Sequence, residues 1–185
     1  MLTKILTLAA AVLTSFSAAV TAEGPSPAGP VAGEASRAAY QRLKTLVGEW
    51  RGSVEWTGAR TGSGVMSARY YLTGNGTAIV ENLETDGTVA MTSVYHLDGG
   101  ELRLTHYCGA GNQPRLKASQ VDEQAGLVRF SFVDITNLKT PESGHVTAVE
   151  LRLNGTQTMT LIFTFVGGGR ESYERIELTR LTDHG

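Results

Sequence analysis

The side chains best suited to chemistry gather in one short polar stretch, residues 105–113. His106 and Cys108 stand two positions apart, so on a strand their side chains point to the same face. A catalytic Cys–His pair needs an imidazole within reach of the sulfur and a third group that orients the ring. Strand neighbours are rather far apart for that, and no orienting carboxylate is evident. His106 therefore either contacts a ligand or is an interior histidine with its hydrogen bonds satisfied.

Cys108 is the only cysteine of the chain, so no internal disulfide can form. A single thiol in a protein of this kind is either a small buried hydrophobe or a reactive group, and we favour the first. Asn112 and Gln113 follow in a glycine-containing loop, where binding residues often lie. This loop could rim a binding site, or it could be a solvated connector. Pro114 limits how the loop enters the next strand.

Two charged residues fall on apolar strand faces. Glu81 shares a face with Ile79 and Leu83, and Arg69 shares one with Val65 and Tyr71. If either side chain points inward it needs a partner, because burying a lone charge is costly. The two could pair with each other or meet a polar ligand group, and on the opposite register both are surface residues.

The remaining patterns argue against several classes of function. The formal net charge is −2, and no cluster of Lys and Arg suggests nucleic acid or an anionic membrane as a partner. His96, His106 and His145 lack metal-ligand spacing, so we expect no metal. Gly167-Gly168-Gly169 lacks the lysine and helix of a phosphate-binding loop.

The first 33 residues precede the predicted domain. Lys4 stands before an apolar run from Ile5 to Val20 that ends in small residues, the pattern of a cleaved export signal over residues 1–22. We therefore expect a periplasmic or secreted protein without stable membrane insertion after cleavage. Residues 23–33 hold three of the five prolines and predict a flexible linker.

Residues 34–183 predict one all-β domain, a barrel with an N-terminal helix that closes one end. Residues 34–47 show helical spacing of Ala39, Tyr40, Leu43, Leu46 and Val47, with Gly48 at the expected cap. After Gly48 the apolar period becomes two, and turn signals such as Asn75-Gly76 and Asp86-Gly87 separate ten short strands. An up-and-down antiparallel barrel is favoured because closure removes the exposed strand edges. The expected strands are 49–57, 63–73, 77–85, 88–97, 101–108, 115–121, 127–133, 145–153, 157–166 and 171–181.

Strand alternation assigns part of the interior. A hairpin through Gly99-Gly100 places Tyr95 opposite Leu104 and Ser93 opposite His106 on a largely apolar face. We expect that face to point inward, which takes Cys108 inward as well. Phe130, Phe132 and Phe163 alternate with polar neighbours and are expected to bury a ligand.

At this point the chain resembles the calycin group of barrels, which includes lipocalins, fatty-acid-binding proteins and nitrobindins. Gly48-Glu49-Trp50 matches the G-x-W of lipocalins, which follows a helix and opens the first strand. The resemblance implies that Arg180, near the end of the last strand, covers Trp50 as a structural residue. Cation–π attraction is the physical reason for such a pairing.

The count of ten strands is more similar to fatty-acid-binding proteins or nitrobindins than to eight-stranded lipocalins, and Gly48–Gly52 resembles the G-x-W-x-G opening of nitrobindins. The resemblance to nitrobindins implies haem held by a histidine late in the chain. After His145 the chain has only His184, in the terminal tail, so no residue matches that ligand and we expect no cofactor. The chain is also similar to uncharacterised secreted bacterial barrels.

Together these patterns predict an exported barrel that holds a small, largely apolar molecule. Binding would come from burial of the ligand, with His106, Tyr95 or Arg69 orienting it. Two alternatives stay open. One is a haem-binding or hydrolytic enzyme that uses His106, and the other is a structural barrel filled by its own side chains.

Overall fold

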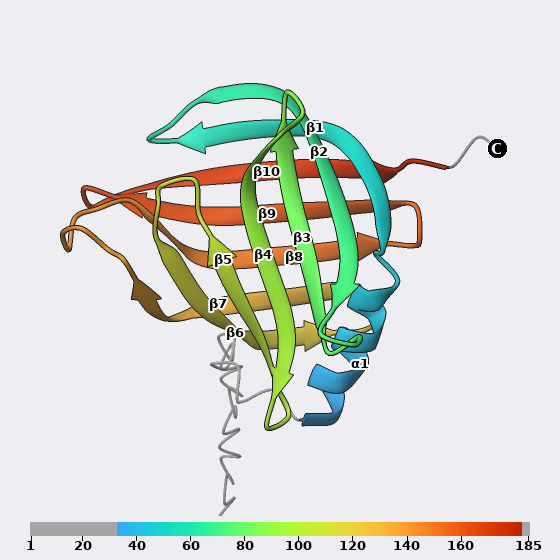
Figure 1. The fold of residues 1–185 in the computed structure, drawn as a ribbon. Helices are drawn as coiled ribbons and strands as arrows, with labels where there is room; N and C mark the ends of the chain where they lie inside the picture. Colours follow the sequence, from blue (N-terminus) through green and yellow to red (C-terminus); the bar gives the residue numbers. More distant parts are fainter. Residues whose placement is uncertain (1–32, 183–185) are drawn as a thin grey trace, which may run out of the picture.

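The computed structural model describes residues 33–182, which form one helix and a closed barrel of ten antiparallel strands (Figure 1). Each strand pairs with its neighbour in sequence, and β1 pairs with β10 to close the sheet. This confirms the predicted fold. The elements are α1 Gly33–Lys44, β1 Gly48–Gly58, β2 Gly62–Thr73, β3 Ala78–Thr85, β4 Thr88–Asp98, β5 Glu101–Tyr107, β6 Gln113–Asp122, β7 Leu127–Thr136, β8 His145–Asn154, β9 Thr158–Gly167 and β10 Arg170–Arg180.

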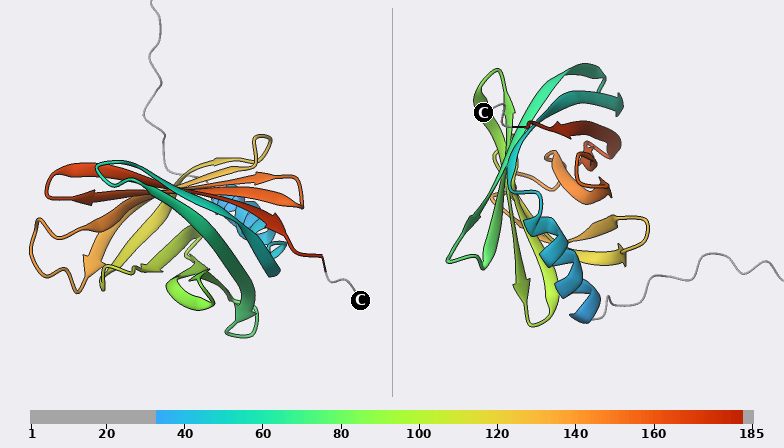
Figure 2. Two further views of the ribbon diagram at one scale, coloured as in Figure 1. Left: turned by 90° about the horizontal axis from the view of Figure 1, so that it is seen from above. Right: turned by 90° about the vertical axis from the view of Figure 1, so that its right-hand side faces the viewer.

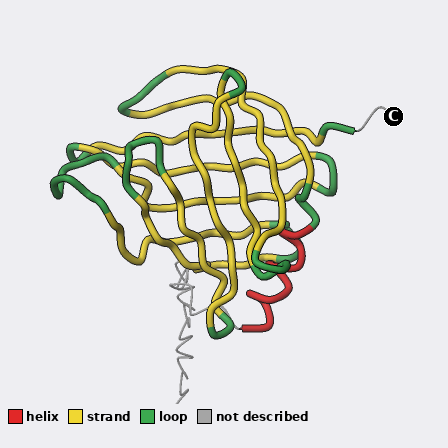
Figure 3. Tube along the Cα trace, in the orientation of Figure 1, coloured by secondary structure: helices red, strands yellow, loops and turns green. Residues whose placement is uncertain are grey.

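The connections between strands alternate between two ends of the barrel. The turns after β2, β4, β6 and β8 lie at the end where α1 packs, and the turns after β1, β3, β5, β7 and β9 lie at the other end (Figure 3). Asn75 and Asp86 adopt positive φ angles of 55° and 51° in their turns. Asn and Asp tolerate this left-handed conformation, which explains their positions before glycine.

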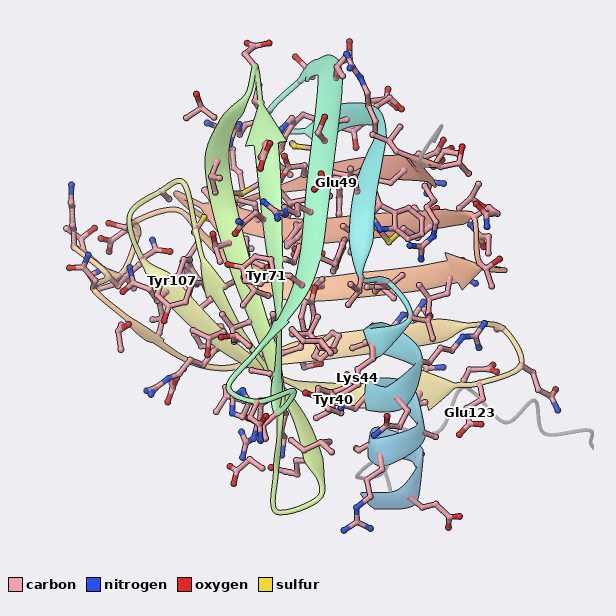
Figure 4. All side chains as sticks on the ribbon, turned by 45° about the vertical axis from the view of Figure 1, so that its right-hand side comes forward. Tyr40, Lys44, Glu49, Tyr71, Tyr107 and Glu123 are labelled. Carbon is pink, nitrogen blue, oxygen red and sulfur yellow. The ribbon has the colours of Figure 1, made fainter. Side chains whose placement is uncertain are left out.

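The helix α1 closes one end of the barrel (Figure 2). Ala39, Tyr40 and Leu43 bury its inner face against the core. Two side chains fix it to neighbouring turns, since Tyr40 donates to the Gly76 carbonyl at 3.4 Å and Arg42 donates to that of Glu123 at 2.7 Å. In Figure 4, Lys44 lies beside Tyr40, and its ammonium is 5.0 Å from the ring centroid.

The predicted end of the helix was three residues too late. After Lys44 the chain tightens, and the N–H of Leu46 donates to the carbonyl of Leu43, three residues back. Leu46 stays in the core, but Val47 is 42% exposed and does not belong to the buried stripe. Gly48 follows with a φ of 131°, which turns the chain into β1.

Trp50 and Arg180 join the helix end to the first and last strands. The two residues are register partners, and the guanidinium carbon lies 4.2 Å from the centre of the Trp50 ring. Arg180 also donates to the carbonyls of Thr45, Val47 and Thr156 at 2.6, 2.8 and 3.1 Å. The Trp50 indole donates to the Leu46 carbonyl at 2.8 Å. These contacts form a junction between β1, β10, the segment after α1 and the turn before β9.

The interior of the barrel is largely filled by side chains. Its buried apolar residues come from all ten strands and the helix and form one cluster. The predicted β4–β5 register is confirmed, with Ser93 opposite His106 and Tyr95 opposite Leu104. The predicted start of β6 was too late, because Pro114 already pairs with Ile135 inside the β6–β7 ladder.

The predicted export signal and nearly all of the predicted linker lie outside the described residues, as does His184. Within residues 33–182, no helix is both long and apolar enough to cross a lipid bilayer.

The junction predicts the effect of Arg180→Ala on stability. The change removes a cation over Trp50 and the donors of three carbonyls, so we expect a loss of about 2 kcal/mol in the free energy of unfolding. Arg180→Lys should recover only part, since one ammonium cannot stack and reach all three acceptors. Urea unfolding measures both.

Arg175→Ala is the matched control on the same strand. Arg175 pairs with Glu177 on the exposed face, and such pairs contribute about 0–1 kcal/mol. Equal losses for Arg180→Ala and Arg175→Ala would contradict the importance of the junction.

Candidate binding site at the open end of the barrel

The end of the barrel opposite α1 contains a pocket of about 340 Å³. This volume lies at the lower end of the range typical of small-molecule sites. Its walls come from most of the strands and are mainly apolar. We call it the mouth pocket. Its apolar lining includes Trp56, Met66, Met91, Val146 and Phe165, and its titratable lining residues are Arg60, Cys108 and Glu174.

Arg60 lies across the mouth pocket because the turn after β1 is tied to β10. The N–H of Ala59 donates to the Glu171 carbonyl at 2.9 Å, and that of Arg60 donates to the buried hydroxyl of Ser172 at 3.0 Å. From this anchored backbone the guanidinium carbon reaches to 3.8 Å from the centre of the Trp56 ring and 5.8 Å from that of Phe165. The two rings meet edge to face, 6.2 Å apart.

Glu174 is the acid of the mouth pocket. It is the register partner of Trp56 on β10 and is only 4% exposed. Burial raises the pKa of its carboxyl to about 7, although the charge of Arg60 and a hydrogen bond from Trp56 act in the opposite direction. Glu174 is therefore divided between its acid and carboxylate forms near neutral pH.

Cys108 lines the same pocket at the end of β5. Its sulfur accepts a hydrogen bond from the Ala110 N–H at 3.5 Å, and burial raises the pKa of the thiol. Two residues deeper, His106 Nδ1 lies 3.0 Å from the hydroxyl of Ser93. The two side chains thus have different partners, and a neutral thiol is a poor nucleophile.

A second polar group lies deeper in the barrel, across β2 to β5. Tyr70 and Tyr95 both donate to Glu81 Oε2, at 2.6 and 2.8 Å, and Ser93 and His106 continue the row. Burial raises the pKa of Glu81, although hydrogen bonds from the two tyrosines and Ser93 lower it. Burial also lowers the pKa of His106 to about 4, so its ring is neutral at pH 7.

This inner row is buried and lies apart from the lining of the mouth pocket. Among the described residues that line the pocket, none belongs to the row. Glu81 Oε1 and His106 Nε2 are buried without a hydrogen-bond partner in the described part of the chain. The sequence-predicted residues His106, Tyr95 and Glu81 are thus brought together, but away from Cys108.

The predicted aromatic residues also lie away from the mouth pocket. Phe130 packs on Tyr95 and Phe163 on His106, with ring centroids 5.8 and 5.0 Å apart, so both belong to the core. Phe132 is 38% exposed and lies 5.6 Å from the ring of His145. None of the three lines the mouth pocket.

The other predicted site residues lie at the surface or in the rim. Arg69 is on the outer face and pairs with Glu49 at 3.2 Å, and Glu49 and Tyr71 are seen on that face in Figure 4. Asn112 is buried and donates to the Gly144 carbonyl at 2.9 Å, which ties two loops together. Gln113 accepts a hydrogen bond from Thr136 at 3.0 Å.

Sequence reasoning missed Tyr70, Glu174 and Arg60. Tyr70 is the register partner of Glu81, so its inward position follows once β2 and β3 are paired. Glu174 lies two residues before Ile176, and continuing the inward alternation of β10 would have found it. Arg60 lies in a turn, where no periodic signal exists.

The described residues do not fit a haem held by His106. The ring is fully buried between Ser93 and Phe163, and the mouth pocket ends at Cys108. Within residues 33–182, no three His, Cys, Asp or Glu side chains gather as a metal site.

The inner row predicts the effect of Tyr95→Phe. Removing one of two hydroxyl donors to a buried carboxyl should lower the free energy of unfolding by about 1–3 kcal/mol. Tyr71→Phe is the control, because Tyr71 lies on the outer face. Thermal or urea unfolding compares them, and similar stabilities for the two variants would contradict the inner row's contribution.

Glu174 predicts a pH dependence of stability. Its folded pKa of about 7 is above its ordinary value of 4.5, so protonation stabilises the fold. This contribution is complete below pH 4.5 and is lost as pH rises to 7, a change of about 3 kcal/mol. Glu174→Gln should flatten the unfolding free energy over that window, and Glu81 should leave a residual slope of the same sign. Outward-facing Glu55→Gln should change little, and an unaltered profile in Glu174→Gln would exclude this account.

No protein-family model and no curated protein matches the chain. Among solved structures, it is similar to Rv2717c from M. tuberculosis, with 17% identity and a TM-score of 0.54 over 78% of this chain and 98% of that one. It is also similar to a protein of unknown function of the DUF3598 family from Nostoc punctiforme, with 13% identity and a TM-score of 0.53 over 75% of this chain and 48% of that one. At these identities the likeness shows the fold, a calycin-like barrel in the broad sense.

Proposed function

We propose that this chain is an exported binding protein that holds a small, largely apolar molecule in the mouth pocket. The observation that supports it is the pocket itself, a hollow of about 340 Å³ with mainly apolar walls and three titratable side chains. Small-molecule sites have this composition, in which apolar walls provide affinity and a few polar groups orient the ligand. Export rests on the sequence pattern of residues 1–22.

The contrast between the two ends supports the mouth as the binding place. Below Cys108 the interior is filled by side chains such as Phe130 and Phe163, and the hollow beneath α1 measures only about 120 Å³. A ligand in the mouth would meet Trp56, Phe165 and the two methionines, Met66 and Met91. Flexible methionine side chains adapt to ligands of different shape.

The expected affinity is moderate. Burying about 300 Å² of apolar ligand surface gains roughly 7 kcal/mol, before the loss of translational and rotational freedom is subtracted. The geometry favours an enzyme less, since His106 is neutral, buried and separated from the pocket.

A titration with N-phenyl-1-naphthylamine, a neutral dye that fluoresces in apolar surroundings, tests the proposal. We expect saturable binding to the protein without its first 22 residues, and a loss of about tenfold or more in affinity for Ala90→Phe. Ala90 is an exposed residue on the pocket wall, so the larger side chain fills the hollow with little effect on folding.

Ala125→Phe is the matched control, because Ala125 lies in an exposed turn at the helix end. Its affinity should equal that of the unchanged protein. Absence of saturable binding, or equal affinity in both variants, would favour a structural barrel instead.

A further inference from the structure

Arg60 has an unused hydrogen-bonding edge at the mouth pocket. One face of its guanidinium covers Trp56, which leaves the N–H groups at the edge of the plane free to donate. Within residues 33–182, Arg60 makes no salt bridge, although its charge acts to lower the pKa of Glu174. A planar fork of donors next to an apolar hollow matches a carboxylate better than a point-like or uncharged group.

The balance of charge in the mouth pocket disfavours cations. The groups that face Glu174 are the Arg60 guanidinium from the turn after β1, the Trp56 indole from β1 and the Cys108 thiol from the end of β5. The walls from β2, β3, β4, β8 and β9 add Met66, Thr85, Met91, Val146 and Phe165, which carry no charge. With one guanidinium cation and a neutral thiol, the pocket has a net charge of 0 or +1, depending on Glu174.

The geometry points to a compact carboxylate amphiphile as the ligand, with its apolar tail among Met66, Met91 and Val146 and its head between Arg60 and Glu174. This inference rests on the proposed function and names the chemical class of the ligand. Arg60 donates to the carboxylate from its free edge. Glu174 in its acid form donates one further hydrogen bond, whereas ionised Glu174 repels the head. Binding therefore weakens as pH rises.

Three eight-carbon probes separate charge from apolar burial, namely octanoate, octan-1-ol and octylammonium. Calorimetric titration at pH ~6 keeps octanoate ionised and most of Glu174 protonated. We expect octanoate to bind about tenfold more tightly than octan-1-ol, and octylammonium more weakly than either. If octan-1-ol binds and octanoate binds no better, the ligand class is wrong while the proposed function stands. If none of the three binds, the proposed function fails.

Arg60→Gln tests the position of the head. Octanoate affinity should fall by about tenfold, whereas octan-1-ol affinity should stay within about twofold. Arg170→Gln is the matched control, because Arg170 is an exposed cation at the same end of the barrel that does not line the pocket. An equal loss in both variants would show that the overall positive charge at this end of the barrel, and not Arg60 itself, attracts the anion.

Octanesulfonate tests Glu174, since its own charge is constant across the range. Between pH ~6 and ~8 its affinity should fall by up to about tenfold in the unchanged protein and stay nearly constant in Glu174→Gln. A flat profile in the unchanged protein, or an equally steep one in Glu174→Gln, would overturn the assignment of Glu174 to the head.

Discussion

The stacking of Arg180 on Trp50 is the interaction on which the rest of the barrel depends. One guanidinium covers the first strand's tryptophan and binds three carbonyls, two of them from the residues that follow α1. Carbonyls near a helix end lack hydrogen-bond partners within the helix, so a cationic side chain there supplies the missing donors. The same residue therefore binds the segment that follows α1, covers Trp50 and joins β1 to β10.

The β1–β10 register at this junction also builds the opposite end. Six residues after Trp50 stands Trp56, and six residues before Arg180 stands Glu174, so antiparallel pairing makes them partners as well. Both pairs point inward because six is an even number of strand positions. The closed end carries a satisfied cation on an aromatic ring, and the open end repeats that motif with Arg60 on Trp56 and a buried acid beside it.

The fold could be predicted from the sequence because its signals are local and repeated. Alternation gave the strands, and glycine-containing turns gave their order and the β4–β5 register. The mouth pocket could not be predicted in the same way. The inward alternation of β10 could have predicted Glu174. Arg60, by contrast, is positioned by the hydrogen bond of its backbone N–H to Ser172 of β10, more than a hundred residues away. For Arg69, alternation alone could not decide which face of the sheet it occupies, and the structure places it on the outer face.

The pairing of β1 with β10 has a consequence for the order of folding. These strands are separated by nearly the whole domain, so the entropy of closing that loop must be offset before their contacts form. Until β10 arrives, the sheet has two free edges, β1 and β9, whose unpaired N–H and C=O groups can recruit other chains. Nascent or truncated molecules without β10 are thus the species most exposed to aggregation, and a chaperone that shields strand edges would act at that stage.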